Sequence, residues 1–233
     1  MSNFNFSDLA TTSFQSNSTN YLKPYDIYKV TLSKIERGNM KGKKDPNANY
    51  DIITIEFTGT DDNPGVFNTN LFVPNKDSDF ERGENPTSGK ASPSSFEKFQ
   101  FTLMQIVEAI NPTGAQKIKD NASKLKSIDD FINIVVKALT GKNNEVYLKL
   151  IGRSNNGTTY ASLPTSCYIN KDTNKPAPLN FISSDRSKLN FSNYELTQMK
   201  QYQNAKPTNM DSIDNTSNDD NDLGDILSEI DDI

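Results

Sequence analysis

The feature that most constrains the fold is the order in which two hydrophobic periodicities follow one another. Apolar residues first alternate with polar ones, as in half-buried β-strands, over 28–33, 53–58 and 66–73. The spacing becomes helical over 94–141, and alternation then returns over 146–151 and 158–163, with 167–169 as a candidate extension past a bulge. We therefore expect three strands, a helical insert and two further strands.

The helical insert has recognisable ends. Ser94 and Glu97 have the spacing of a capping box, and an apolar stripe follows them as far as Pro112. A weaker helical stretch covers 114–125. Ser127 begins a further helix, which Gly141 ends as a C′ glycine. A short helix is also expected over 195–203.

The strands are joined by polar, turn-rich segments. Glu36–Asn49 holds Gly38, Gly42 and Pro46, and we expect a loop there. Asp61–Gly65 predicts a tight turn, 74–95 a long connection and Gly152–Gly157 a second loop.

The residues that are absent exclude many enzyme chemistries. The chain has no histidine and one cysteine, so histidine-based triads, histidine-ligated metals and internal disulfides cannot occur. The acid pairs Asp61-Asp62 and Asp129-Asp130 could hold Mg²⁺, but one lies in a turn and the other in the first turn of a helix, where acids are favourable anyway. We expect no enzyme, no cofactor and no metal site.

The charge is divided along the chain. The net charge is −5, yet nine of the 30 acidic residues lie in 211–233, which has no Lys or Arg. This leaves 21 acidic against 25 basic residues in 1–210. A mildly basic body with an acidic tail is typical of a tail that competes with a polyanion or recruits partners; a solubility tail is the alternative.

The end of the tail carries an apolar stripe at helical spacing, set among acids. Such a stripe favours a segment that folds into a partner's groove. The expected partner-binding residues are Asp222, Leu223, Ile226, Leu227, Ile230, Asp231, Asp232 and Ile233.

These patterns divide the chain into three parts. Residues 1–20 are rich in Asn, Ser and Thr and predict a flexible arm, 21–205 one folded domain, and 206–233 a disordered acidic tail. No apolar run is long enough to cross a membrane, and Met1–Phe4 has no leader pattern, so we expect a cytoplasmic protein.

Five strands with a helix between the third and fourth is the order of an OB-fold barrel. Such barrels bind oligonucleotides on strands 2 and 3, between the 1–2 and 4–5 loops. Cations that follow phosphates and rings that stack on bases suit single strands. The candidate nucleic-acid-binding residues are Lys29, Arg37, Lys41, Lys43, Lys44, Tyr50, Phe72, Tyr147, Lys149, Arg153 and Tyr160.

The strand order, the basic loops, the acidic tail, and the segments Tyr21–Tyr25 and Ser95–Phe99 together resemble the single-stranded DNA-binding proteins of bacteria and, most closely, of tailed bacteriophages. The resemblance implies an OB-fold-like, mainly β domain that coats single-stranded DNA during replication, recombination and repair. It also implies a tail that competes for the DNA cleft and recruits replication or recombination proteins, in a bacterial host's cytoplasm. The chain ends in isoleucine where this family has an aromatic residue, which favours phage-encoded partners.

A virion structural or assembly protein, with a β-barrel core and flexible arms at both ends, is the main alternative. It predicts stable oligomers and no salt-dependent binding to single strands.

Overall fold

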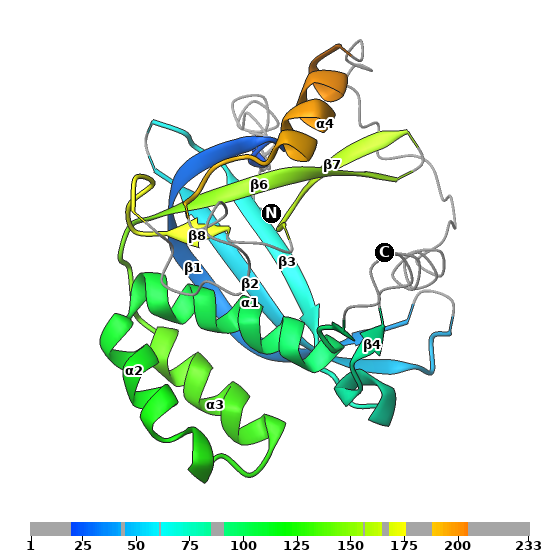
Figure 1. Cartoon of the computed structure of the whole chain (residues 1–233), viewed down its shortest axis with the longest axis vertical. Coiled ribbons are helices and arrows are strands. Elements are labelled where there is room, and N and C mark those ends of the chain that lie inside the picture. The colour runs from blue at the N-terminus through cyan, green and yellow to red at the C-terminus, as the bar shows by residue number, and fades with distance from the viewer. Residues whose placement is uncertain are drawn as a thin grey trace, which may run out of the picture.

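The fold is mixed α/β, built on a mostly antiparallel sheet (Figure 1). The computed structural model describes residues 20–42, 45–60, 62–84, 91–155, 157–164, 168–175 and 188–204. The predicted N-terminal arm, apart from Asn20, and the predicted acidic tail lie outside these residues.

One sheet runs in the order β3-β2-β1-β6-β7. The short strand β8 pairs with residues 147–148 of β6, and β7 pairs with residues 151–155 of β6. Its long first strand is shared: residues 30–41 pair with β2 and residues 26–30 pair with β6. A register shift between Leu32 and Lys34 lets the strand bend between these two partners. The strands are β1 (Asp26–Lys41), β2 (Asn49–Gly59), β3 (Val66–Phe72), β6 (Val146–Asn155), β7 (Thr158–Ser162) and β8 (Ile169–Asn170).

The helices form where the capping patterns predict them. The Ser94 hydroxyl accepts a hydrogen bond from the Glu97 N–H at 3.1 Å, and Ser127 and Asp130 make the same kind of capping box. The insert contains α1 (Ser95–Ile110), α2 (Pro112–Asp120), η3 (Ala122–Lys124) and α3 (Ile128–Leu139). A last helix, α4 (Asn193–Asn204), follows the sheet, which confirms the short helix expected there.

The connection between β3 and α1 holds short elements. They are η2 (Asp77–Phe80) and a separate two-stranded sheet of β4 (Gly83–Glu84) and β5 (Ala91–Ser92). None of the described helices is long and apolar enough to cross a membrane.

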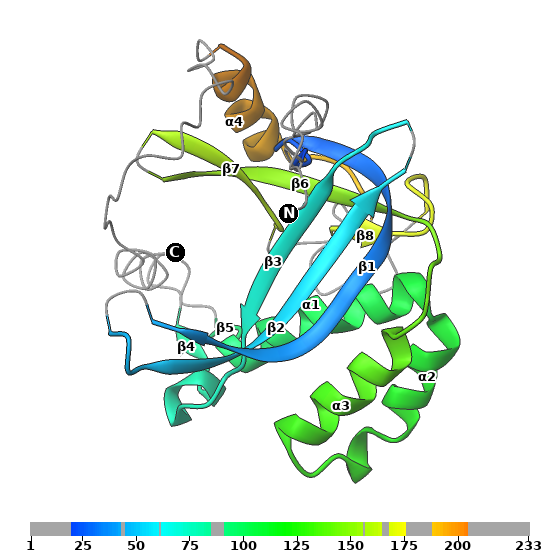
Figure 2. The same cartoon turned by 180° about the vertical axis from the view of Figure 1, so that it is seen from behind.

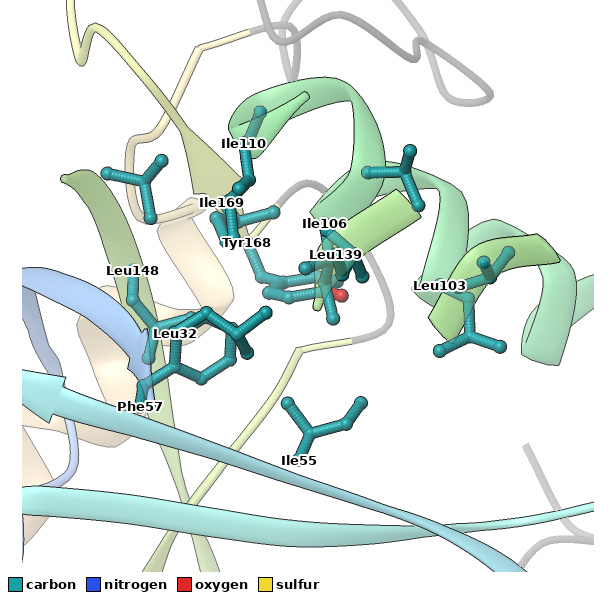
Figure 3. Close-up of a cluster of buried hydrophobic side chains, with 14 of the residues drawn as sticks. Leu32, Ile55, Phe57, Leu103, Ile106, Ile110, Leu139, Leu148, Tyr168 and Ile169 are labelled. Atoms are coloured by element: carbon teal, nitrogen blue, oxygen red, sulfur yellow. The ribbon is translucent and has the colours of Figure 1, made fainter. Parts of the chain in front are cut away.

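The core lies between the sheet and α1. Leu32, Ile55 and Phe57 point from the sheet toward Leu103 and Ile106 on the helix (Figure 3). Tyr168 lies among them and is fully buried; its hydroxyl donates a 2.6 Å hydrogen bond to the Thr102 carbonyl. The apolar alternation that predicts the strands is therefore the sheet's inner face.

The structure confirms the order of elements and corrects three features. β6 continues through Asn155, so residues 152–155 of the predicted loop Gly152–Gly157 are strand. β1 continues through Lys41, so half of the predicted loop 36–49 is strand and residues 42–48 join β1 to β2. The predicted closed barrel is wrong: the sheet stays open, and β3 and β7 are unpaired with each other among the described residues. The class is accordingly mixed α/β rather than mainly β. Of the predicted extension over 167–169, Ile169 pairs with β6 as part of β8, while Cys167 lies outside the described residues.

Candidate nucleic-acid interface

The outer face of β1, β2 and β3 is open to solvent. Figure 2 shows these three strands from the side opposite α1, with no helix over them. Because side chains alternate across a strand, residues paired in register share a face. On this face Met40 lies opposite Tyr50, Phe72 opposite Ile52 and Asn70 opposite Thr54.

Two aromatic rings meet at the end of this face. The Tyr50 and Phe72 ring centroids are 5.7 Å apart and nearly perpendicular, and the side chains are 39% and 51% exposed. Ile52 is buried beneath them although it belongs to the outer face and not to the core cluster. Met40 reaches across β2, with its sulfur 4.0 Å from the Asn70 amide nitrogen. We call Met40, Tyr50, Ile52 and Phe72 the aromatic platform.

The platform lies beside the end of the β1–β2 hairpin. Gly42 closes this turn by donating a 3.0 Å hydrogen bond to the Ala48 carbonyl, and a Cβ there would lie 2.7 Å from the Asp45 carbonyl oxygen. The Tyr50 ring packs against the same glycine. Lys41 ends β1 in an exposed position and forms no ion pair within the described residues. Lys43 and Lys44 lie outside those residues.

A second ring and cation face each other on the β6–β7 hairpin. Arg153 and Tyr160 are direct partners in the antiparallel register, and both are exposed. Cross-strand partners of this kind lie about 5 Å apart at Cβ. Arg153 makes no ion pair within the part of the chain that the structure describes. The two hairpin ends project to the same side of the molecule in both views (Figures 1 and 2).

Lys29 and Tyr147 are also cross-strand partners, on β1 and β6. Tyr147 is half-buried, and the Lys29 ammonium pairs with Glu145 in an exposed ion pair. A hydrogen bond from the ammonium to the Glu145 carboxylate raises the pKa of Lys29. Lys29 therefore lies on the predicted binding surface, but its ammonium is already paired with Glu145.

Arg37 lies in β1 rather than in a loop, and the structure assigns it a structural role. Its guanidinium donates two 3.0 Å hydrogen bonds from Nε to the Asp51 carboxylate and forms a 2.8 Å ion pair with Asp129 on α3. These contacts, with Asp51 the strongest, raise the pKa of Arg37. Arg37 thus ties the end of the sheet to the helical insert, and its predicted place in a loop is corrected to strand β1.

Lys149 faces outward in the alternation, as predicted, but it is not exposed. Its side chain is 2% exposed, because residues from the segment before and within α4 cover it. Alternation places it correctly, since Leu148 and Leu150 on either side are core residues. Alternation alone could not show that a distant segment covers it.

The remainder of the outer face is polar and carries both signs of charge. Lys34 pairs with Glu36 on β1, and the Ser33 hydroxyl donates to the Glu56 carboxylate at 2.9 Å. Thr54 donates a 3.0 Å hydrogen bond to the Asn70 side-chain oxygen. On this face the exposed rings of Tyr50 and Phe72 therefore lie near the end of the β1–β2 hairpin, away from Glu36 and Glu56.

Sequence reasoning missed two members of the platform, Met40 and Ile52. The signal was present for Ile52, because Ile52 and Ile53 are adjacent and one of two consecutive strand residues must face outward. The expected tail residues 222–233 lie outside the described part. Within the described residues no group of three or more Cys, Asp or Glu side chains could hold a metal ion.

Comparison with known proteins adds no identity. No protein-family model matches the chain, and no curated protein matches it. What the arrangement can do must therefore be argued from its chemistry. Exposed rings supply faces for stacking, and neighbouring cations attract a polyanion.

Proposed function

We propose that this protein binds single-stranded DNA, and that it coats and protects exposed strands during replication, recombination and repair. The aromatic platform is the observation that carries the proposal. Two exposed rings on a helix-free sheet face supply the flat apolar surfaces on which bases stack, whatever their sequence. Duplex DNA would offer such rings no free base faces.

The topology supports the proposal. The order of three strands, a helical insert and two strands, with β1 paired to both β2 and β6, supports an OB-fold-like arrangement. In that fold the oligonucleotide lies across strands 2 and 3, between the loops that follow strands 1 and 4. Tyr50 and Phe72 lie on the corresponding strands, and Lys41 and Arg153 lie on the two hairpins that flank them.

The charge distribution supports it as well. Residues 1–210 carry an excess of four positive charges, and Lys41 and Arg153 are exposed cations without ion pairs among the described residues. Phosphate contacts release counterions, so binding through such cations weakens as salt rises. The acidic tail, by the same logic, competes with DNA for the cations and is free to recruit replication or recombination proteins when DNA displaces it.

The test is direct binding. We expect a labelled 30-nucleotide single strand to bind the full chain, by fluorescence anisotropy, with an affinity that falls steeply between 50 and 200 mM salt, as is typical of phosphate contacts (about 10³-fold or more for six contacts). A tenfold excess of unlabelled duplex should not displace it. Absence of binding at low salt, together with a stable high-mass oligomer, would instead support the virion structural protein.

A further inference from the structure

Five of the predicted binding residues share one face of the sheet's other half. Along β6, Leu148 and Leu150 point into the core, so Tyr147, Lys149 and Arg153 point outward together. Lys29 is the partner of Tyr147 and Tyr160 is the partner of Arg153. We call Lys29, Tyr147, Lys149, Arg153 and Tyr160 the β6 face.

The centre of this face is covered, while one end is open. Arg153 and Tyr160 are exposed, but Lys149 is 2% exposed. Its cover is residues 188–204, which precede the acidic tail and include α4; α4 lies beside β6 in both views (Figures 1 and 2). We call residues 188–204 the cover segment.

The cover segment offers Lys149 the same groups that a nucleotide would offer. The Lys149 ammonium donates to both carboxylate oxygens of Glu195, at 3.1 and 3.2 Å, and to the Asn190 carbonyl at 3.0 Å. The Phe191 ring centroid lies 5.6 Å from the same nitrogen. The Lys149 ammonium is therefore in contact with an anion and an aromatic ring. A DNA phosphate could replace the anion, and a base could replace the ring.

Within the described residues, α4 lies on the surface of the domain. None of the α4 side chains is buried, and Tyr194 is 73% exposed. Leu189 is buried, and Tyr202 packs against Tyr25 at 5.5 Å between ring centroids. The buried ion pair with Glu195 is one attachment of α4, and its attraction is offset by the cost of desolvating both charges. A competing anion can replace Glu195 without leaving Lys149 unpaired.

We propose that the β6 face is a second part of the single-stranded DNA site, centred on Lys149, and that the cover segment occupies it until DNA displaces that segment. The inference rests on the proposed function. It adds Lys149 to the binding residues and makes the Glu195 carboxylate a competitor of the DNA phosphates. Because the chain continues from Asn204 into the acidic tail, displacement of the cover segment would release both together.

Two variants and one matched control test the competition in the full chain. Glu195→Gln removes the competing anion, and a larger binding-competent fraction should raise single-strand affinity at least about fivefold. Asp172→Asn is the control, since it removes the same charge from an ion pair, with Lys175, that includes no residue of the β6 face; it should change affinity much less. Adding Lys149→Met to Glu195→Gln should abolish the gain and lower the slope of log affinity against log salt by about one.

A measurement on the wild type does not depend on any variant folding. Saturating single-stranded DNA should increase hydrogen exchange in residues 193–204, because displaced helix amides lose their internal hydrogen bonds. If DNA binds while these amides stay equally protected, or if Glu195→Gln and Asp172→Asn bind alike, the inference is wrong and the proposed function stands. If no form of the chain binds single strands, both fail.

Discussion

Tyr50 and Phe72 stand edge to face on the open side of the sheet, with ring centroids 5.7 Å apart and Ile52 buried beneath them. Ile52 is the register partner of Phe72 and faces the same side as Tyr50, so the three side chains share one apolar patch in which both rings stay partly exposed. The pair is thus held in place by packing and yet presents ring surface to solvent, as a stacking platform requires.

The first prediction concerns these rings. Tyr50→Ala and Phe72→Ala should each weaken single-strand binding by about 1–3 kcal/mol, which is about fivefold to 150-fold, because each ring stacks on a base. Anisotropy titration with a 30-nucleotide strand measures the change. Tyr194→Ala is the matched control, since Tyr194 is the most exposed aromatic on α4 and lies off the platform. Equal losses in all three variants would contradict the prediction.

The second prediction separates two cations on one strand. Lys41→Met should weaken binding and reduce the salt slope by about one, because Lys41 is exposed and unpaired among the described residues. Arg37→Met should leave the salt slope unchanged and lower the free energy of unfolding by about 1 kcal/mol, because it breaks the contacts with Asp51 and Asp129. Salt titrations and urea unfolding of both variants test this. The reverse pattern would place Arg37 in the interface.

The third prediction concerns pH. Hydrogen bonds from Arg82 and from the Ser94 N–H hold the pKa of Glu97 below its ordinary value. The folded state therefore binds the Glu97 proton less readily than the unfolded chain does, and this carboxylate stabilises the fold above the ordinary carboxyl pKa of about 4.3. The stabilisation is lost as the pH falls through the lowered pKa.

Glu97→Gln tests that prediction. Its deficit in unfolding free energy relative to the wild type should be largest near neutral pH and should shrink below about pH 4, where the wild-type group is also uncharged. Urea unfolding from pH 7 to pH 3 measures it, with Glu81→Gln as a control for the loss of an exposed carboxylate near the cap. A deficit that does not change with pH would show that the charge is unimportant.

The fourth prediction concerns the acidic tail. Deleting residues 211–233 removes nine acids and no base, which changes the net charge of the chain from −5 to +4. If the tail competes with DNA, the deletion should raise single-strand affinity most at low salt, because screening weakens the competition as salt rises. A deletion with unchanged affinity at low salt would mean that the tail does not compete.

The local parts of the fold could be predicted because their signals are local. The alternation of Ile53, Ile55 and Phe57 marks the inner face of β2, and the spacing of Ser94 and Glu97 marks the start of α1; both are present in the structure. Such patterns require no knowledge of what the element packs against.

The extent of β1 could not be predicted in the same way. Gly38 and Gly42 suggest a loop, but pairing with β2 along residues 30–41 outweighs the weak strand preference of these residues. Closure of the barrel depends on two sheet edges, β3 and β7, that are distant in sequence, and no local pattern reports whether they meet.

In the candidate site, too, the sequence predicts which way a side chain faces but not which distant segment covers it. Tyr50, Phe72, Arg153 and Tyr160 are outward-facing in the alternation and exposed in the structure. Lys149 is equally outward-facing, yet it is buried by a partner 46 residues later, Glu195. The spacing of Ser192 and Glu195 signals a helix start, and nothing in it signals that the carboxylate also reaches Lys149.

The most direct measurement is photo-crosslinking of the full chain to a single strand that carries 5-iodouracil, followed by mass-spectrometric mapping of the crosslinked residues. It tests both that single strands bind and where they bind. The account predicts crosslinks at Tyr50 and Phe72 and on the β6–β7 hairpin at Tyr160. Crosslinks confined to the helical insert, or none at saturating DNA, would contradict it.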